Sequence, residues 1–327
     1  MGTPVVSIDG LQVSFTSRGR EFTVVDDVTF DIESGVATAL VGESGSGKSV
    51  TALSILGLLP PNARISGSIR HDGRELLGLN ARAMRRIRGG EIGMVYQGGM
   101  SSLNPAFTVG DQIAETVMTH LGLSQSDALE RAVDLLDRVG IPAARRRVKD
   151  YPHMFSGGMQ QRVMIAMAVS TDPKLLIADE PTTALDATVQ AQVLELLAEL
   201  RDTSSMALLF LTHDLGAVAA LCDRVVVMYA GQVVEMGDAM ELFGRPRHPY
   251  AEGLIGSVSR MDRLEDPKSI PGSIPSPWNL PAGCNFHPRC PYQQPAFCAV
   301  GPVPLQKVGD RDVRCVRARE LELRGSS

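Results

Sequence analysis

The feature that most constrains the fold is the octapeptide Gly42–Ser49, GESGSGKS, which matches the GxxxxGK(S/T) pattern of a phosphate-binding loop. An apolar, β-prone run at residues 36–41 precedes it, and residues 49–59 carry apolar side chains at helical spacing. The glycines therefore fall at a strand-to-helix turn. There they let backbone N–H groups point at phosphate oxygens, and the helix N-terminus adds positive potential. We expect a nucleotide-binding parallel-sheet core.

Two side chains of this loop have distinct predicted tasks. Lys48 is placed to reach the β- and γ-phosphates, and Ser49 is placed to ligate Mg²⁺. The alternative is a flexible glycine loop without a ligand, which the strand and helix on either side make less attractive. The residues predicted to contact ATP are Gly42, Glu43, Ser44, Gly45, Ser46, Gly47, Lys48 and Ser49.

Two further apolar runs end in polar residues that suit phosphate chemistry. Residues 175–178 read as a strand buried in a parallel sheet, and Asp179 and Glu180 follow it. Because ligands bind at the carboxyl ends of such strands, we expect Asp179 to hold Mg²⁺ and Glu180 to polarise the attacking water. Residues 207–212 end in the same way at His213. The alternatives are a surface acid pair and a structural histidine.

Five motifs follow one another along the chain: the P-loop, Gln97, FSGGM at 155–159, ADEP at 178–181 and His213. In this order and at these separations they resemble the ATP-binding-cassette (ABC) family. The resemblance implies an α/β fold with a RecA-like parallel-sheet core, an antiparallel β subdomain and a helical subdomain. It also implies an ATPase that uses ATP and Mg²⁺, in which two cassettes close on two ATP molecules.

Residue roles at the dimer interface follow from the resemblance alone. Ser156, Gly157 and Gly158 of one chain would contact the γ-phosphate held by the partner's P-loop. A helix starting at about residue 159 would add its N-terminal potential to that contact. The segment that ends in Asp186 would line the dimer seam, and His213 would contact the γ-phosphate.

Two other family positions are predicted with departures or alternatives beside them. Gln97 would sense Mg²⁺ and the membrane partner, and with Glu180 and His213 it completes the predicted catalytic set. Gly98 and Gly99 follow it where the family usually has an acidic residue and proline, which could loosen the segment that meets the permease. Phe15 is the candidate for stacking on adenine, with ordinary core packing as the alternative.

Three longer phrases look like the ATPases of oligopeptide, dipeptide and nickel importers. They are YQGGMSSLNP at 96–105, YPHMFSGGMQQR at 151–162 and RHPYAEGL at 247–254. Phe155 stands where the family usually has leucine, a swap between apolar residues that packing tolerates. The phrases carry no nucleotide chemistry, so they discriminate within the superfamily. The resemblance extends from residue 6 to about residue 315.

Composition bounds the remaining possibilities. With 327 residues and 44% hydrophobic residues, the chain can build one large domain with an appendage. No apolar stretch approaches the roughly 18 residues of a membrane span, and the N-terminus lacks a secretion signal. The formal net charge of −5 provides no basic field for nucleic acid. We expect no nucleic-acid partner, and membrane work would need partner subunits.

We expect an ABC ATPase domain at residues 1–250, with a helical subdomain at about 98–168, and a C-terminal extension at 251–327. Strands are predicted at 5–15 and 24–32. In the helical part, Ser124 should cap a helix whose apolar face holds Leu129, Val133, Leu136 and Val139 and which Gly140 ends.

The proline-rich extension has little room for a core of its own and contains four of the five cysteines. Five, seven and sixteen residues separate them, without the CxxC pairs of structural zinc sites. Reduced cytosolic thiols argue against disulfides, and small core-poor segments usually need a staple. Charge alone leaves a 4Fe–4S cluster and tetrahedral zinc both open, and the family resemblance favours the cluster. The predicted ligands are Cys284, Cys290, Cys298 and Cys315.

The resemblance implies the motor subunit of an importer, for di- or oligopeptides first and for nickel or another small solute as the alternative. Its partners would be a second ATPase subunit, as homodimer or paralogue heterodimer, two integral-membrane permeases and an extracellular or periplasmic substrate-binding protein. It would act at the cytoplasmic face of the membrane. A soluble cassette ATPase acting on DNA or ribosomes is the runner-up, although the sequence has no long coiled-coil insertion and only one cassette. A non-hydrolysing regulator fits poorly with Glu180 and His213.

Overall fold

The computed structural model describes residues 4–17, 19–96, 102–183, 185–257 and 269–326. These residues form two compact units. The first unit comprises residues 1–5, 33–36 and 78–210. The second comprises residues 6–32, 37–77 and 211–327, so the P-loop and the C-terminal extension share one unit.

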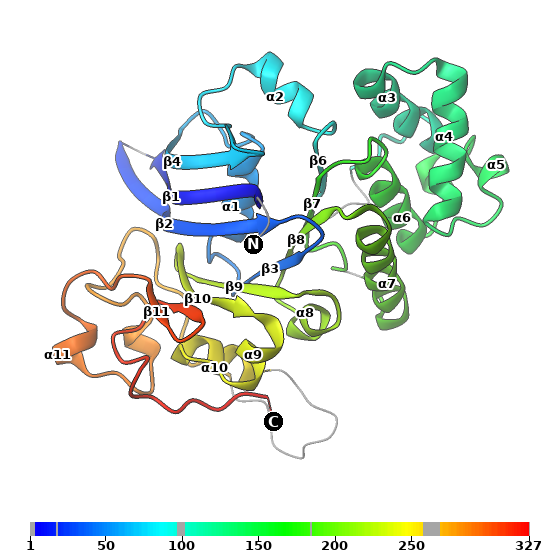
Figure 1. Cartoon of the computed structure of the whole chain (residues 1–327). Coiled ribbons are helices and arrows are strands. Elements are labelled where there is room, and N and C mark those ends of the chain that lie inside the picture. Colours follow the sequence, from blue (N-terminus) through cyan, green and yellow to red (C-terminus); the bar gives the residue numbers. More distant parts are fainter. Residues whose placement is uncertain (1–3, 18, 97–101, 184, 258–268, 327) are drawn as a thin grey trace. The chain divides into compact units, whose positions relative to one another are not determined.

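The second unit begins with an antiparallel sheet in the order β2-β1-β4-β5 (Figure 1). Its strands are β1 (Pro4–Ser17), β2 (Arg20–Glu33), β4 (Ala63–His71) and β5 (Arg74–Glu75). The pairing of β1 with β4 shifts between Asp9 and Gln12. This bulge explains why the buried residues of β1 change from even positions to odd ones along the strand. Both strands predicted for this region are confirmed.

A second sheet in this unit runs in the order β11-β12-β10-β9-β3. Its strands are β3 (Ala37–Val41), β9 (Arg224–Tyr229), β10 (Gln232–Asp238), β11 (Gln306–Val308) and β12 (Arg311–Val313). β3 is parallel to β9, and every residue of β3 is buried, as expected for a strand covered on both faces. β12 pairs antiparallel with β10, so part of the C-terminal extension is built into the sheet.

The helices of this unit are short. α1 (Lys48–Ile55) starts at the end of the P-loop, as the strand-to-helix prediction requires. The others are α8 (Leu215–Leu221), α9 (Ala239–Gly244), α10 (Pro249–Gly256), the 3₁₀ turn η3 (His287–Arg289) and α11 (Pro295–Cys298).

The first unit contains the strands β6 (Ile92–Val95), β7 (Leu175–Asp179) and most of β8 (Ala207–Thr212), in the order β8-β7-β6. β6 and β7 are parallel, with Met94 opposite Ile177. Two helices, α2 (Ala81–Ile87) and α7 (Ala187–Ser204), accompany them. A helical group also belongs to this unit (Figure 1): α3 (Val109–Leu121), α4 (Gln125–Arg138), α5 (Ala144–Arg147), the 3₁₀ turn η2 (Pro152–Met154) and α6 (Gly157–Ala168).

Helix α4 confirms its predicted start and refines its predicted face. Ser124 is the N-cap, and its hydroxyl accepts a hydrogen bond from the Asp127 N–H at 3.2 Å. Of the predicted face, Leu136 and Val139 are buried, whereas Leu129 and Val133 are half-buried. The other buried residues of the helix are Ala128, Ala132 and Leu135. Ala128 and Ala132 are fully buried, so small side chains share the face for which only large apolar residues were predicted.

Among the described residues, no helix is long and apolar enough to cross a membrane.

Candidate nucleotide site and its C-terminal contacts

The P-loop has a backbone that only glycine can adopt at its critical positions. Gly42, Gly45 and Gly47 have φ values of 153°, 83° and 106°, all in the region that L side chains rarely enter. A Cβ on Gly42 would lie 2.2 Å from the Met228 carbonyl oxygen, so this position also lacks the space for a side chain. The loop thus follows directly from strand β3 into helix α1 with the turn that the sequence predicts.

Lys48 and Ser46 are placed as a phosphate cradle requires. The Lys48 ammonium donates hydrogen bonds to the carbonyl oxygens of Gly42 at 2.7 Å and Glu43 at 3.1 Å, so it lies over the loop. The Ser46 hydroxyl is fully buried and has no hydrogen-bond partner within the described part of the chain. A buried, unsatisfied hydroxyl at a loop of glycines beside a helix N-terminus fits a phosphate ligand. The residues present therefore suit ATP.

Glu43 is held from two sides by residues from the C-terminal third of the chain. Its backbone N–H donates to the Tyr250 hydroxyl at 2.9 Å. Its carboxylate accepts two hydrogen bonds from the Arg289 guanidinium, at 2.8 and 3.0 Å. The Arg289 side chain is 7% exposed and that of Glu43 is 28% exposed, so this bidentate pair is largely shielded from water.

Arg289 is itself fixed by its surroundings. Its Nε donates to the Pro271 carbonyl at 2.8 Å, and one Nη donates to the Tyr229 hydroxyl at 3.3 Å. The guanidinium also lies over the rings of Tyr229 and Phe286, with centroids 5.7 and 6.0 Å from its central carbon. Burial alone would lower the pKa of Arg289, but its hydrogen bonds to Glu43 and Tyr229 raise the pKa above the ordinary value. The cation is therefore permanent.

Three aromatic rings gather at the predicted base-stacking position. Phe15 on β1 and Phe22 on β2 stack with ring centroids 6.0 Å apart. Trp278 of the C-terminal extension lies against Phe22, with centroids 3.9 Å apart, and is 51% exposed. Phe15 is not a buried core residue, so the stacking hypothesis stays open.

The predicted catalytic acids lie at the end of β7 in the first unit. Asp179 is buried as the last residue of the strand. Glu180 follows with φ of 47°, a left-handed conformation that is uncommon for glutamate. The Thr183 hydroxyl donates to the Glu180 carboxylate at 2.9 Å, which fixes its orientation. Both acids thus stand at a strand end, as predicted, and their catalytic roles stay predictions.

The predicted signature residues form the start of α6. Ser156 is the N-cap, and its hydroxyl accepts from the Met159 N–H at 3.4 Å. Gly157 and Gly158 form the first turn, where backbone N–H groups point outward. A Cβ on Gly158 would lie 2.5 Å from a methyl carbon of Val189 on α7, so this glycine is also required for helix packing.

The remaining predicted residues have local structural roles. Asp186 is the N-cap of α7, and its carboxylate accepts from the N–H groups of Thr188 and Val189 at 3.1 and 3.0 Å. His213 is exposed directly after β8 and belongs to the second unit. Gln97 lies outside the described residues, as does Ala184 of the predicted dimer seam.

Comparisons with known proteins agree with this geometry. The family model of the ABC transporter matches residues 25–183, and that of the oligopeptide/dipeptide transporter C-terminal region matches residues 234–298. A protein of Brucella abortus (strain 2308), provisionally named a peptide import ATP-binding protein, is 50% identical over 97% of this chain and 98% of its own length. The chain belongs to the ABC transporter family. A similarly named protein of Brucella suis biovar 1 (strain 1330) is also 50% identical, over 95% of this chain and 94% of its own length.

Solved structures of ABC cassettes have the same fold. A post-hydrolysis dimer of the ATP-binding cassette MJ0796 bound to ADP and Pi aligns with a TM-score of 0.64 at 25% identity, over 72% of this chain and 98% of that one. The cbiO1 protein of Clostridium perfringens, part of the ABC transporter complex cbiONQ, aligns with the same score at 26% identity, over 74% and 91%. The predicted ABC-type fold class is therefore confirmed, and these alignments cover about three quarters of the whole chain.

The prediction of a metal centre in this ABC protein is wrong. Across the described residues, no group of three or more His, Cys, Asp or Glu side chains could hold a metal ion, so neither a 4Fe–4S cluster nor zinc is supported. Cys284, Cys290, Cys298 and Cys315 carry free thiols. Burial raises the pKa of Cys284, that of Cys290 to about 11 and that of Cys315 to about 12.

The extension is held instead by buried arginines. Arg314 donates to the carbonyl oxygens of Val233 at 2.9 Å and Val303 at 3.0 Å, and pairs with Asp27 at 3.0 Å. Arg311 pairs with Glu235 of β10 at 2.9 Å, with exposed fractions of 3% and 0%. These contacts supply the staple that the sequence argument assigned to a metal.

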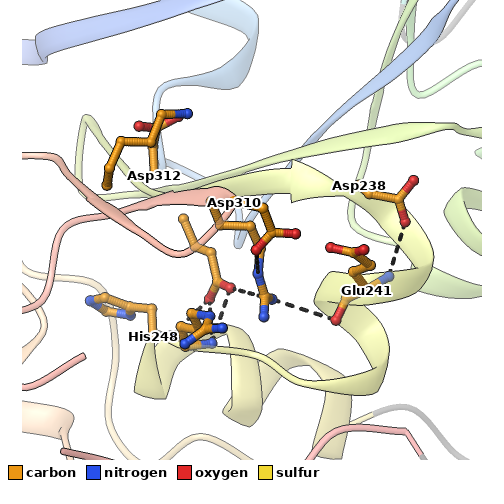
Figure 2. A network of polar contacts seen from close by, with 9 residues as sticks. Asp238, Glu241, His248, Asp310 and Asp312 are labelled. Carbon is orange, nitrogen blue, oxygen red and sulfur yellow. Dashed lines mark hydrogen bonds and ion pairs between the residues drawn. The ribbon is translucent and has the colours of Figure 1, made fainter. Parts of the chain in front are cut away.

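The Glu235–Arg311 pair belongs to a polar network in which Glu235 contacts His248 and Arg311 contacts Glu241 and Asp310; these three partners are labelled in Figure 2. The Glu235 carboxylate also accepts from the backbone N–H groups of Arg247 and His248, at 2.9 and 2.7 Å. Burial raises the pKa of Glu235 to about 7, although these donors and Arg311 lower it. Burial lowers the pKa of His248 to about 3. Its Nδ1 accepts a hydrogen bond from the Tyr250 N–H at 3.0 Å, so this nitrogen carries no proton, as expected for a neutral imidazole.

Sequence reasoning missed the residues of the C-terminal third of the chain that contact the nucleotide site. Tyr250 lies in the phrase RHPYAEGL, which was interpreted as carrying no nucleotide chemistry, yet it contacts the P-loop backbone. Arg289 lies in the HPRC segment, where only the cysteine was assigned a role from the sequence. In the sequence these two residues are distinguished only as an isolated aromatic and an isolated basic residue in segments without periodicity. Such a pattern does not indicate which residue they contact.

Proposed function

We propose that this chain is the ATP-hydrolysing subunit of an ABC importer for di- or oligopeptides. The observation that carries the ATPase part is the P-loop cradle, in which three glycines with positive φ, the buried Ser46 hydroxyl and the Lys48 ammonium surround one turn. The substrate class rests on the peptide-import names of relatives that match nearly the whole chain at 50% identity.

In the proposed reaction, the P-loop N–H groups and Lys48 bind the phosphates of ATP, and Glu180 orients and polarises the attacking water. Mg²⁺, when bound, neutralises phosphate charge, and Ser49 and Asp179 would hold it with Gln97. Phe15 would stack on the adenine. His213 would contact the γ-phosphate, and Asp186 would line the dimer seam.

The chain would work as a dimer with a second cassette, either another copy or a paralogue. Ser156, Gly157 and Gly158 would then meet the ATP held by the partner's P-loop, in keeping with their place at the start of α6. The dimeric state of the ADP-bound cassette that shares this fold supports this arrangement. Closure would drive two permeases at the cytoplasmic face of the membrane, supplied by a substrate-binding protein. The ATPase domain at 1–250, its helical subdomain at about 98–168 and the extension at 251–327 are proposed as the functional division.

The test is the Glu180→Gln variant. It should retain ATP binding and lose at least about 100-fold in turnover, because general-base catalysis contributes on that order. Glu195→Gln, on the exposed face of α7, is the matched control and should hydrolyse ATP as the wild type does. Lys48→Ala should weaken both binding and turnover.

The same Glu180→Gln variant can identify the partners. Tagged and expressed in the source cell, it should trap closed dimers with ATP and copurify two multi-span proteins from solubilised membranes. Undiminished hydrolysis by Glu180→Gln would refute the assigned base. Recovery of soluble partners alone would refute the importer.

A further inference from the structure

In the part of the chain that the structure describes, the P-loop residue Glu43 is contacted by two residues from the C-terminal third of the sequence. Tyr250 from α10 accepts the Glu43 N–H, and Arg289 from η3 holds the Glu43 carboxylate through two hydrogen bonds. All three residues belong to the same compact unit. Backbone and side chain of one P-loop residue are thus fixed from outside the loop.

The position of Glu43 in turn determines the geometry of the phosphate cradle. Its carbonyl oxygen accepts from the Lys48 ammonium at 3.1 Å and from the Ser46 N–H at 3.2 Å. A rotation of the Glu43 peptide would therefore move the lysine and the buried serine together. Binding groups that are held in place before the ligand arrives lose less freedom on binding, which favours affinity.

Arg289 is well suited to hold a loop in place. Its guanidinium is anchored by the Pro271 carbonyl at 2.8 Å and lies over the Tyr229 and Phe286 rings, and its side chain is 7% exposed. A planar guanidinium that forms two parallel hydrogen bonds fixes both the position and the orientation of a carboxylate. Glu43 cannot swing away without leaving a buried cation unpaired.

We propose that Arg289 is a positioning residue for ATP binding, which acts through Glu43 to hold the P-loop in the conformation that receives the phosphates. The C-terminal extension is then a working part of the nucleotide site of its own chain. This inference rests on the proposed ATPase function.

The experiment measures KM for MgATP, kcat and the melting temperature of the full-length chain. Arg289→Ala should raise KM about tenfold, equivalent to about 1.4 kcal/mol, with kcat within about twofold of the wild type. The expected tenfold rise in KM is the lower end of the roughly 10–100-fold cost of removing a residue that orients a metal ligand, a comparable positioning role. The KM of Arg289→Lys should lie between those of the wild type and Arg289→Ala, because an ammonium replaces the bidentate contact with a point charge.

A double-mutant cycle and a control separate positioning from general loosening. Glu43→Gln should raise KM as Arg289→Ala does, and the double variant should be no worse than either single variant. Arg317→Ala is the matched control: Arg317 is an extension arginine that pairs with Glu320 at 3.0 Å. It should leave KM unchanged.

Each opposite result is decisive. A wild-type chain without ATPase activity would refute the proposed function and this inference with it. An active wild type with an unchanged KM in Arg289→Ala would overturn the inference alone, whatever the melting temperature. Additive effects in the double variant, or an equal rise of KM in Arg317→Ala, would also overturn it, because the extension would then act only through overall stability.

Discussion

Replacing Glu235 by glutamine should be one of the most damaging neutral substitutions in the second unit. Glu235 is fully buried, and Arg311, which is 3% exposed, donates to it at 2.9 Å. In Glu235→Gln the amide oxygen can still accept the backbone N–H of His248, but the amide N–H₂ group would then face the guanidinium, so that two donors meet.

The magnitude follows from what Arg311 would retain. Its other contacts are the Glu241 carbonyl at 3.5 Å and the exposed Asp310 carboxylate at 3.9 Å. Breaking a buried pair and leaving one charge uncompensated costs about 3–5 kcal/mol. Because Asp310 offers partial compensation, we expect a loss of about 3 kcal/mol of unfolding free energy at about pH 8.5, where the Glu235 carboxyl, with its pKa of about 7, is ionised.

The partner substitution should cost less. In Arg311→Met the remaining Glu235 carboxyl can take up a proton, since burial already raises its pKa to about 7, whereas a guanidinium cannot lose its proton near neutral pH. We expect a loss of about 1–2 kcal/mol for Arg311→Met, and the double variant should not exceed it, because both buried charges are removed.

The assay is urea unfolding followed by the fluorescence of Trp278, the only tryptophan of the sequence, which packs on Phe22 in the same unit. Lys307→Met is the control, because Lys307 is 69% exposed where it pairs with Asp312 at 3.1 Å, and surface pairs contribute little. A loss below about 1 kcal/mol for Glu235→Gln, or a greater loss for Arg311→Met than for Glu235→Gln, would refute the reasoning.

Two further predictions concern pH and packing. The native pKa of His248, about 3, lies below the unfolded value of about 6.5, so the unfolded state binds more protons between these values and stability falls as pH falls. His248→Asn keeps an acceptor for the Tyr250 N–H and serves as the reference. Between pH 6 and 4 the unfolding free energy of the wild type should fall by about 1.4 kcal/mol per pH unit more than that of the variant. Equal pH slopes in urea unfolding would contradict this. Gly158→Ala should cost about 1–3 kcal/mol in thermal unfolding because its methyl would meet Val189, and Val189→Ala should restore most of the loss; no rescue would exclude this contact as the cause.

The local part of the nucleotide site could be predicted from the sequence because its chemistry is local. The order strand, glycine loop, helix is contained in 23 consecutive residues at 37–59, and the strand-end acids Asp179 and Glu180 need only the apolar run before them. Roles that depend on a second chain could be predicted only by resemblance. Asp186 illustrates the limit, since its carboxylate has a capping role that the seam hypothesis did not include.

The extension was misjudged because its contacts are distant in sequence. Arg289 and Glu43 are separated by 246 positions, and nothing near either residue indicates the other. The cysteine argument assumed that a segment without a core needs a covalent or metal staple. Arg311, Arg314 and the pairing of β12 with β10 provide a third solution, which cysteine spacing cannot reveal.

The pairing of β12 with β10 has a consequence for how this chain can be divided. In the sheet order, β12 covers the side of β10 that faces away from β9, so removal of the extension would turn β10 into an open edge. Open edges recruit strands from other molecules and promote aggregation. The same truncation would remove Arg311 and leave the buried Glu235 carboxylate without its ion-pair partner. A chain truncated after residue 250 would therefore expose β10 as an unpaired edge strand and be prone to aggregation. The boundary between the ATPase domain and the extension that the sequence indicates is not a boundary between independently folding parts.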